Sequence, residues 1–224
     1  MSKIVLVGAC GALVWLLRRY FGGGVCRTCL SLKGKTAIIT GGNTGIGKAT
    51  ALALARRGAK VILACRSIAR GDRAAKEIRQ EVRDAEIGVR FLDLSSLGSV
   101  RRFVDDFLRS KNRLHILVNN AGMYGCPHWK SEDGYEMHFA VNHLGHFLLT
   151  NLLLDTLSRC GPSRVVVVSS SLHKYAKINF DDLHGDKCYV PGAAYSQSKL
   201  ANILFARELS KRLPPGTWPV LGIL

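Results

Sequence analysis

The pair of residues with the clearest chemical potential is Tyr195 and Lys199, four positions apart in Tyr195-Ser-Gln-Ser-Lys199. If the segment that runs to Arg212 is a helix, one turn places both side chains on the same face. A phenol loses its proton only near pH ~10, but an ammonium group about one turn away favours the phenolate and lowers that pKa. The pair is therefore a candidate general acid and base. The alternative is a partly exposed tyrosine near a solvated lysine.

A glycine-rich turn lies upstream, between a predicted strand and a predicted helix. The β-rich run Lys35–Thr40 is followed at once by Gly41-Gly-Asn-Thr-Gly-Ile-Gly47, and helical periodicity continues to Arg57. Glycines let the backbone approach a pyrophosphate, and a helix N-terminus supplies N–H groups and partial positive charge. We expect a dinucleotide here, and the alternative is a glycine-rich connection without a ligand. The residues expected to hold it are Gly41, Asn43, Thr44, Gly45, Ile46 and Gly47.

The residue after the second predicted strand selects the cofactor. That strand is Lys60–Ala64, and Cys65-Arg66 follows it. An acidic residue there would bind a ribose 2′-hydroxyl, whereas a guanidinium suits a 2′-phosphate through charge-assisted hydrogen bonds. The sequence therefore predicts NADP(H) in preference to NAD(H). The alternative is that Arg66 is a solvated loop arginine.

Strands and helices continue to alternate along the chain. Helices are predicted near 69–83 and 97–108, and strands at 89–94, 116–118 and 164–168. Repeated βα units with apolar strands are typical of an α/β fold with a parallel, doubly wound sheet. Strand ends meet the ligand in such folds. We therefore add Asp93, Asn120 and Gly122 to the expected cofactor site and place the Ser169–Ser171 hydroxyls at the ligand crevice.

Two histidines, His143 and His146, lie in a long helical stretch from Gly134 to Leu157. No carboxylate or cysteine is placed to complete a metal site with them, so packing or surface roles are expected. The lone Cys26-Arg-Thr-Cys29 has no second pair at zinc-finger spacing, and no metal is predicted. Reduced thiols in a cytosol-facing protein are the default for the cysteines.

The 224 residues fit one sizeable domain with a net charge of +16, from 32 Lys and Arg against 16 Asp and Glu. This balance favours an anionic partner: a nucleic acid, an acidic membrane surface or a phosphorylated cofactor. The basic residues are scattered and no nucleic-acid module is visible, so a nucleic-acid partner is not expected.

The N-terminus carries an uncharged, mostly apolar run from Ile4 to Leu17. As a helix it would span about 21 Å, short of a ~30 Å hydrocarbon core, and it could be a signal-peptide core, a short anchor or an interfacial helix. Positive charge is denser after the run than before it, which predicts a cytosolic main domain. We predict a membrane anchor at 1–21, a linker at 22–34 that contains Gly22–Gly24, and a dinucleotide-binding catalytic domain at 35–224.

Together these motifs resemble the short-chain dehydrogenase/reductase family, from about Lys33 to Arg212. The matching features, in the family's order, are Thr40-Gly-Gly-Asn-Thr-Gly-Ile-Gly47, Asn119-Asn-Ala-Gly122, Asn142, Ser170 and Tyr195-x-x-x-Lys199. Further segments resemble the microsomal retinol dehydrogenase branch: Cys126-Pro-His-Trp129, Glu132-Asp-Gly134, Val141-Asn-His-Leu-Gly-His-Phe147 and Ser196-Gln-Ser-Lys-Leu-Ala-Asn202. The long spacing from Ser170 to Tyr195 is similar to that branch, and the resemblance selects Ser170 over its neighbours.

The resemblance implies catalytic roles for four residues. Tyr195 exchanges the proton with the substrate oxygen, Lys199 lowers the pKa of Tyr195 and holds the nicotinamide ribose, and Ser170 binds and polarises the substrate carbonyl. Asn142 supports a water-mediated proton relay. Hydride passes between nicotinamide and substrate carbon. The resemblance further implies a retinal/retinol-type or other lipophilic aldehyde or alcohol as substrate, in an endoplasmic reticulum membrane with the catalytic domain facing the cytosol.

The chain departs from the family pattern near its end. The family's sheet continues through a sixth and a seventh strand, but Pro219 falls where the sixth strand would be, and proline is poorly tolerated in a central strand. We therefore expect a truncated or alternatively spliced product whose catalytic domain is incomplete at its C-terminal side. Its sheet would end at the fifth strand and leave Val165–Val168 as an exposed apolar edge. The alternative function is a catalytically inactive, membrane-tethered cofactor-binding remnant or splice product. The oligomeric state is left open.

Overall fold

The computed structural model describes residues 11, 13–17, 28, 30–110, 113–213 and 217–223. The chain divides into two compact units, Met1–Leu30 and Ser31–Leu224. In the first unit, residues 13–17 are helical and their apolar side chains are exposed. Within the described part of the chain, no helix has the length and apolar character needed to cross a membrane. The Gly22–Gly24 linker and the Cys26/Cys29 pair lie outside the described residues.

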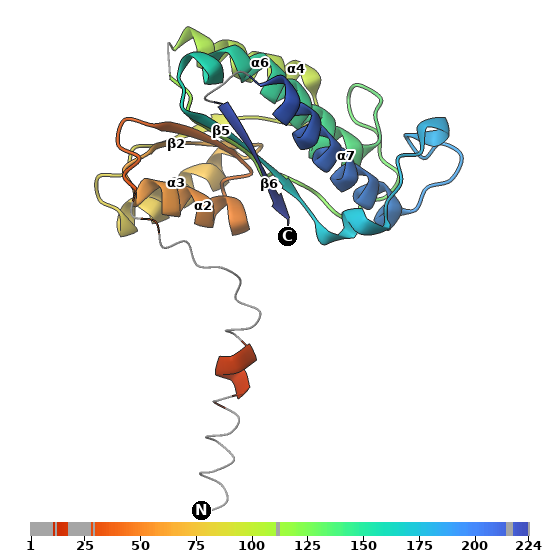
Figure 1. Ribbon diagram of the computed structural model, residues 1–224, viewed down its shortest axis with the longest axis horizontal. Helices are drawn as coiled ribbons and strands as arrows, with labels where there is room; N and C mark the ends of the chain where they lie inside the picture. Colours follow the sequence, from red (N-terminus) through yellow and green to blue (C-terminus); the bar gives the residue numbers. More distant parts are fainter. Residues whose placement is uncertain are drawn as a thin grey trace, which may run out of the picture. The chain divides into compact units, whose positions relative to one another are not determined.

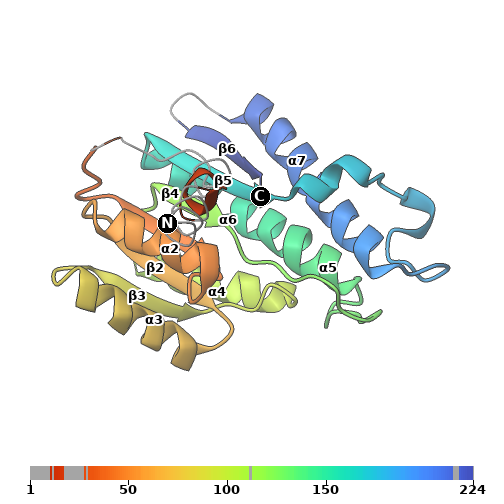
Figure 2. The ribbon, with the colours of Figure 1, turned by 90° about the horizontal axis from the view of Figure 1, so that it is seen from below.

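The second unit is built on a six-stranded parallel sheet with the order β3-β2-β1-β4-β5-β6 (Figures 1 and 2). The strands are β1 Thr36–Thr40, β2 Lys60–Cys65, β3 Ile87–Phe91, β4 Ile116–Asn119, β5 Ser163–Ser169 and β6 Thr217–Ile223. In the register, Ile38 of β1 pairs with Ile62 on one side and Leu117 on the other. The strand order reverses between β1 and β4, which is the switch point where ligands bind in doubly wound sheets.

Helices cover both faces of this sheet, as Figure 1 shows. One face carries α2 Gly45–Ala55 and α3 Ile68–Glu81, and the other carries α4 Leu97–Arg109, α6 Gly145–Arg159 and α7 Pro191–Arg212. Shorter pieces are α5 Met137–Phe139, the π-helix η1 Ala140–Leu144 and the 3₁₀ helices η2 Ser171–Tyr175 and η3 Phe180–Asp182. Each face has its own apolar core: Phe103, Leu149 and Phe205 lie in one, Ala51 and Ala74 in the other.

The predicted alternation of strands and helices is confirmed, with shifted boundaries. The third strand ends at Phe91, so Asp93 lies in the turn beyond it. The helical stretch expected from Gly134 begins only at Met137, because Gly134 adopts a φ of +82° that a helix does not allow. The helix then widens into the π-helix η1, a distortion that is frequent at functional sites.

The expectation that the sheet ends at the fifth strand is wrong. β6 pairs with β5 from Ser163 to Ser169, and Pro219 lies opposite Val165. β6 is an edge strand, and an edge strand tolerates a proline because alternate N–H groups point away from the sheet. Val165, Val167 and Val168 are all buried, so β5 is not an exposed apolar edge.

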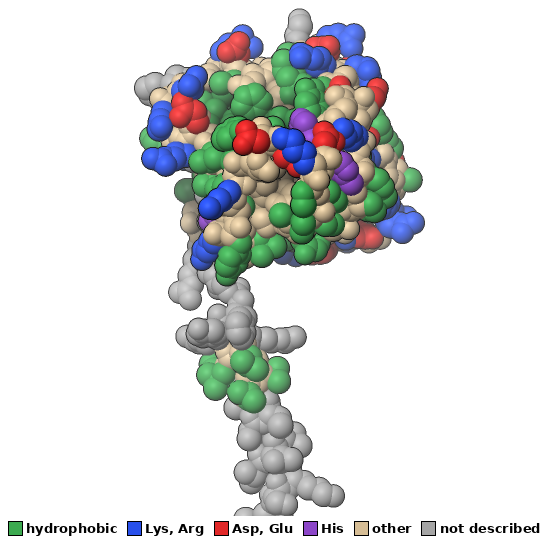
Figure 3. All heavy atoms as spheres, turned by 90° about the vertical axis from the view of Figure 1, so that its right-hand side faces the viewer, with side chains coloured by type: hydrophobic (Ala, Val, Ile, Leu, Met, Phe, Trp, Pro, Cys, Tyr) green, Lys and Arg blue, Asp and Glu red, His purple; other side chains and the backbone are tan. Residues whose placement is uncertain are grey.

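Charged side chains are dispersed over the face of the molecule that Figure 3 displays. Lys and Arg side chains there are interspersed with Asp and Glu and do not form one basic patch. The net charge of +16 therefore does not mark this face as a binding surface. Among the cysteines that the structure describes, Cys65, Cys126, Cys160 and Cys188 are free thiols.

Candidate active site

A cleft of about 450 Å³ opens where β1, β2, β4 and β5 end. Every residue predicted to bind the cofactor lines it: Gly41, Asn43, Thr44, Gly45, Ile46, Gly47, Arg66, Asp93, Asn120, Gly122, Tyr195 and Lys199. These residues come from both halves of the domain, and the strand order brings them together at the switch point. The predicted grouping is thus present in the structure.

The glycine turn forms a cradle that side chains would fill. A Cβ added at Gly47 would lie 2.4 Å from the Gly41 carbonyl oxygen and 2.6 Å from Asn120 Nδ2, and Gly41 itself has a φ of +65°. Helix α2 begins at Gly45, within the glycine motif, and Thr44 makes no side-chain cap bond to it. The first N–H groups of α2 are therefore available to an anion, which is the requirement of a pyrophosphate. The residues present fit a dinucleotide.

Thr40, at the end of β1, connects the turn to the end of β4. Its buried hydroxyl accepts hydrogen bonds from the backbone N–H groups of Asn120 and Ala121, both at 2.9 Å. Asn120 Nδ2 in turn donates to the Thr40 carbonyl oxygen at 2.8 Å. These bonds hold the two strand ends in fixed register beneath the cleft.

Asn142 is fully buried in the π-helix and lies behind the wall of the cleft. Its Oδ1 accepts from the Met123 N–H at 2.9 Å, and its Nδ2 donates to the Met123 carbonyl at 3.1 Å and to Ser198 Oγ at 2.9 Å. A Cβ at Gly122 would lie 3.3 Å from Asn142 Oδ1 and 3.4 Å from Lys199 Nζ. Gly122 therefore lies beside both polar groups and leaves them room.

Tyr195 and Lys199 both lie on α7 and both line the cleft, so the predicted shared face is confirmed. Lys199 is only 4% exposed, and its Nζ donates to the Val168 carbonyl at 3.3 Å. Burial lowers the pKa of Lys199 to about 8. Its Nζ lies 5.5 Å from the centroid of the Tyr195 ring, which also packs edge-on against Tyr124 at 4.8 Å and against His138 at 6.2 Å.

The structure separates the two serines at the end of β5. Ser169 lines the cleft, but its hydroxyl is used by the backbone because it donates to the Lys199 carbonyl at 2.8 Å. Ser170 is half-buried and caps η2, where its Oγ accepts from the Leu172 N–H at 3.4 Å. Ser170 and Asn142 are not among the residues that line the cleft.

Of the two histidines in the helical stretch, His143 has the expected packing role, whereas His146 makes two buried polar contacts. His143 lies among the rings of Phe139, Phe147 and Phe205 at centroid distances of 5.1, 6.0 and 6.1 Å, and burial lowers its pKa. His146 is buried, and its ring nitrogens lie against the Thr40 hydroxyl and the Asn142 carbonyl oxygen.

Arg70 and Tyr124 are among the residues of the cleft that sequence reasoning missed. Arg70 is exposed in the first turn of α3, four residues after Arg66, and both arginines line the cleft. No helical spacing relates the two arginines, because Arg66 precedes the helix, so no local signal marks Arg70. Tyr124 follows the predicted strand end by a few residues in a loop with no regular pattern, and no local signal marks it.

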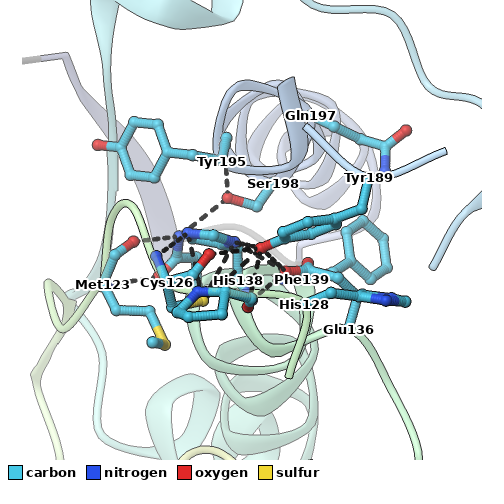
Figure 4. A network of polar contacts seen from close by, with 12 residues as sticks. Met123, Cys126, His128, Glu136, His138, Phe139, Tyr189, Tyr195, Gln197 and Ser198 are labelled. Atoms are coloured by element: carbon cyan, nitrogen blue, oxygen red, sulfur yellow. Dashed lines mark hydrogen bonds and ion pairs between the residues drawn. The ribbon is translucent and has the colours of Figure 1, made fainter. Parts of the chain in front are cut away.

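A second polar network, also unexpected, lies behind Tyr195 (Figure 4). In the part of the chain that the structure describes, Cys126, Glu136 and His138 form one group with ligand atoms close enough for a metal ion, within 4.8 Å of one another. These atoms already bond one another: His138 Nδ1 lies 2.7 Å from Glu136 Oε1, and the Tyr189 hydroxyl lies 3.2 Å from the same Nδ1. The geometry is that of a satisfied hydrogen-bond network.

This arrangement supports one kind of chemistry well. A phenol with a buried ammonium group beside it can exchange a proton at the end of a cleft whose other end fits a dinucleotide. A sequence model of the short chain dehydrogenase family matches residues 35–217. The chain belongs to this family.

Within the short chain dehydrogenases, the chain falls in the retinol dehydrogenase branch. Retinol dehydrogenase 12 of Bos taurus is 56% identical over 197 residues, which are 88% of this chain and 62% of that relative. Retinol dehydrogenase 13 of Homo sapiens is 51% identical over 218 residues, 95% of this chain and 66% of the relative. The chain thus spans less than two thirds of the length of the bovine relative.

Solved structures of short chain dehydrogenases have the same fold. A protein from Mycobacterium paratuberculosis, described as uncharacterized, superposes with a TM-score of 0.73 at 46% identity, over 82% of this chain and 64% of its own. An alcohol dehydrogenase of Thermococcus sibiricus complexed with 5-hydroxy-NADP gives 0.66 at 28% identity, over 84% and 74%. A Burkholderia phymatum protein in complex with NAD gives 0.69 over 87% and 66%, and at 23% identity it shows the fold alone.

Proposed function

We propose that this chain is an NADP(H)-dependent oxidoreductase of the retinol dehydrogenase type. Its substrate is retinal, retinol or another lipophilic aldehyde or alcohol. The observation that carries the proposal is that Tyr195 and Lys199 line the same cleft as the glycine cradle. The similarity to retinol dehydrogenases supports the substrate class.

The preference for NADP(H) rests on charge at the rim of the cleft. Arg66 and Arg70 are both exposed there, at the end of β2 and in the first turn of α3. Two guanidinium groups suit a 2′-phosphate, and no carboxylate occupies the position after β2 that would bind a 2′-hydroxyl. The fold itself does not choose between the cofactors, because similar folds hold either one.

Four side chains have roles in this proposal. The cofactor, when bound, supplies or accepts a hydride. Tyr195 gives a proton to the substrate oxygen during reduction and takes one during oxidation, and the Lys199 ammonium stabilises the phenolate. Lys199 also holds the nicotinamide ribose. Ser170 orients and polarises the carbonyl, and Asn142 supports the water-mediated path by which Tyr195 recovers its proton.

A membrane location fits a substrate that dissolves in lipid. We propose that residues 1–21 attach the chain to the endoplasmic reticulum membrane, that 22–34 form a linker, and that the domain from residue 35 faces the cytosol. The exposed apolar side chains of residues 13–17 support an interfacial or anchoring role for this segment. Measuring whether alkaline carbonate extracts the chain from microsomes tests the attachment.

The decisive experiment measures NADPH oxidation by membranes that contain the 224-residue chain, with all-trans-retinal as substrate and a Tyr195→Phe variant as control. The proposal expects turnover in the wild type, its loss in the variant and equal NADPH binding by both. NADPH binding without turnover would refute the enzymatic function and support the alternative, a catalytically inactive chain that binds the cofactor. Absence of both would refute the proposed function.

A further inference from the structure

His146 bridges two parts of the site that are far apart in the sequence. Its side chain is 1% exposed. On one side its Nε2 lies 2.8 Å from the hydroxyl oxygen of Thr40, at the end of β1. On the other side its Nδ1 lies 3.1 Å from the carbonyl oxygen of Asn142, in the π-helix.

The partners determine the direction of both hydrogen bonds. Burial lowers the pKa of His146 to about 3, so the imidazole is neutral and carries one proton. The Asn142 carbonyl can only accept, and the proton is therefore on Nδ1. Nε2 then accepts from the Thr40 hydroxyl at 2.8 Å, and the Val118 carbonyl oxygen, at 3.3 Å from the same hydroxyl, is the more distant alternative acceptor. A neutral histidine is the side chain that offers one donor and one acceptor on opposite edges of a rigid ring.

Each end of this bridge continues into the site. The Thr40 hydroxyl accepts from the N–H groups of Asn120 and Ala121, which border the cleft. The Asn142 side chain donates to Ser198 Oγ, which itself donates to the Tyr195 carbonyl at 2.6 Å. His146 thus connects the cofactor side of the cleft with the helix that carries the proposed acid and base.

We propose that His146 is a positioning residue, which holds Asn142 in place relative to the end of β1. The effect on turnover rests on the proposed function, whereas the effect on Asn142 does not. A structural role alone would require only that the two buried hydrogen bonds add to stability. A positioning role requires that the bond to Asn142 matter more for turnover than the bond to Thr40.

Two substitutions of His146 each remove one of its two hydrogen bonds and keep the other. His146→Asn keeps a donor at the Nδ1 position: in the same helix, Asn151 Nδ2 donates to the Phe147 carbonyl four residues earlier, at 2.8 Å. His146→Gln instead places an amide oxygen near the Nε2 position, where it can accept from Thr40 but leaves the Asn142 carbonyl without this donor. Each variant loses one buried hydrogen bond, so their stabilities are expected to fall by similar amounts.

The expected turnover differs between the variants. His146→Gln is expected to lower kcat by about 10-fold or more, since a small misplacement of a catalytic group costs up to about 100-fold. His146→Asn is expected to lower kcat by less than about 3-fold on the same reasoning. The dissociation constant for NADPH should change little in either variant. Asn151→Ala, which removes an exposed bond of the same kind from α6, is the matched control with unchanged kcat.

A second readout is independent of turnover. Hydrogen–deuterium exchange should accelerate at the Met123 amide in His146→Gln, because that amide is bonded to Asn142 Oδ1. In His146→Asn it should accelerate instead at Asn120 and Ala121, whose amides depend on Thr40. If the wild type shows no turnover, the proposed function fails and this exchange pattern still decides the positioning role. Equal losses of kcat, or exchange changes at the same amides in both variants, would overturn the inference.

Discussion

Replacing Lys199 by methionine is expected to stabilise the fold while it abolishes turnover. The Lys199 side chain is buried without a carboxylate partner among the described residues, and burial lowers its pKa from the ordinary 10.5 to about 8. The charged form is therefore disfavoured in the folded chain relative to the unfolded chain. Methionine fills a similar volume without a charge, so Lys199→Met removes this cost.

The size of the effect follows from the two pKa values. A difference of about 2.5 between the unfolded and the folded chain corresponds to about 3 kcal/mol in the free energy of unfolding. The variant also loses the bond from Nζ to the Val168 carbonyl, which is worth about 1 kcal/mol. That carbonyl keeps a partner, because Asn202 Nδ2 donates to it at 3.1 Å. We expect the variant to be about 2 kcal/mol more stable than the wild type at pH 7.

The pH dependence gives this prediction its test. The buried charge of Lys199 destabilises the folded chain by the full amount below the folded pKa of about 8, where the lysine is charged in both states. This destabilisation decreases as the pH approaches the unfolded pKa of 10.5. Urea unfolding followed by circular dichroism should therefore show the advantage of Lys199→Met at pH 7 and a smaller advantage at pH 10. Lys211→Met, at a 60% exposed position of α7, should change stability little. The reasoning would be refuted if Lys199→Met were less stable than the wild type at pH 7, or if the difference in stability between them did not change with pH.

Two further predictions concern the cofactor. Gly47→Ala should weaken NADPH binding by about 10-fold or more in a fluorescence titration, because overpacking against backbone costs about 1–3 kcal/mol and the new Cβ would lie 2.4 Å from the Gly41 carbonyl oxygen. Gly88→Ala, whose Cβ meets nothing within 4 Å, is the control, and equal affinities of the two variants would contradict the cradle. Arg66→Asp should shift the ratio of kcat/KM for NADPH over NADH towards NADH by about 10-fold or more, since a charge-assisted bond is replaced by repulsion. An unchanged ratio would leave Arg66 as a solvated loop arginine.

The predictable parts of the fold and site are those with local signals. The glycine turn, the apolar strands and the Tyr195–Lys199 spacing each need only a few neighbouring residues to be recognised. Parallel strand ends meet at one edge of a sheet, so the motifs at the ends of β1 and β4 were expected in one cleft before any side chain was placed. Their joint appearance in the cleft confirms that reasoning.

The missed parts depend on long-range arrangement. Pro219 argues against a strand only if the strand is central, and strand order decides that. The network behind Tyr195 joins Cys126 to Tyr189, which are 63 residues apart. Neither residue has a partner at helical or strand spacing, so no local pattern could have linked them.

The histidines show where a sequence argument stops short of a site. The lack of a nearby carboxylate or cysteine was sufficient to argue against a metal at His143 and His146. The same argument could not distinguish the two histidines, because they differ in the side chains that surround them in the folded chain. His143 turns into an aromatic cluster, whereas His146 turns towards Thr40 and becomes a polar bridge. Since that bridge reaches α7 through Asn142 and Ser198, a residue first assigned to packing connects the cofactor cradle with Tyr195.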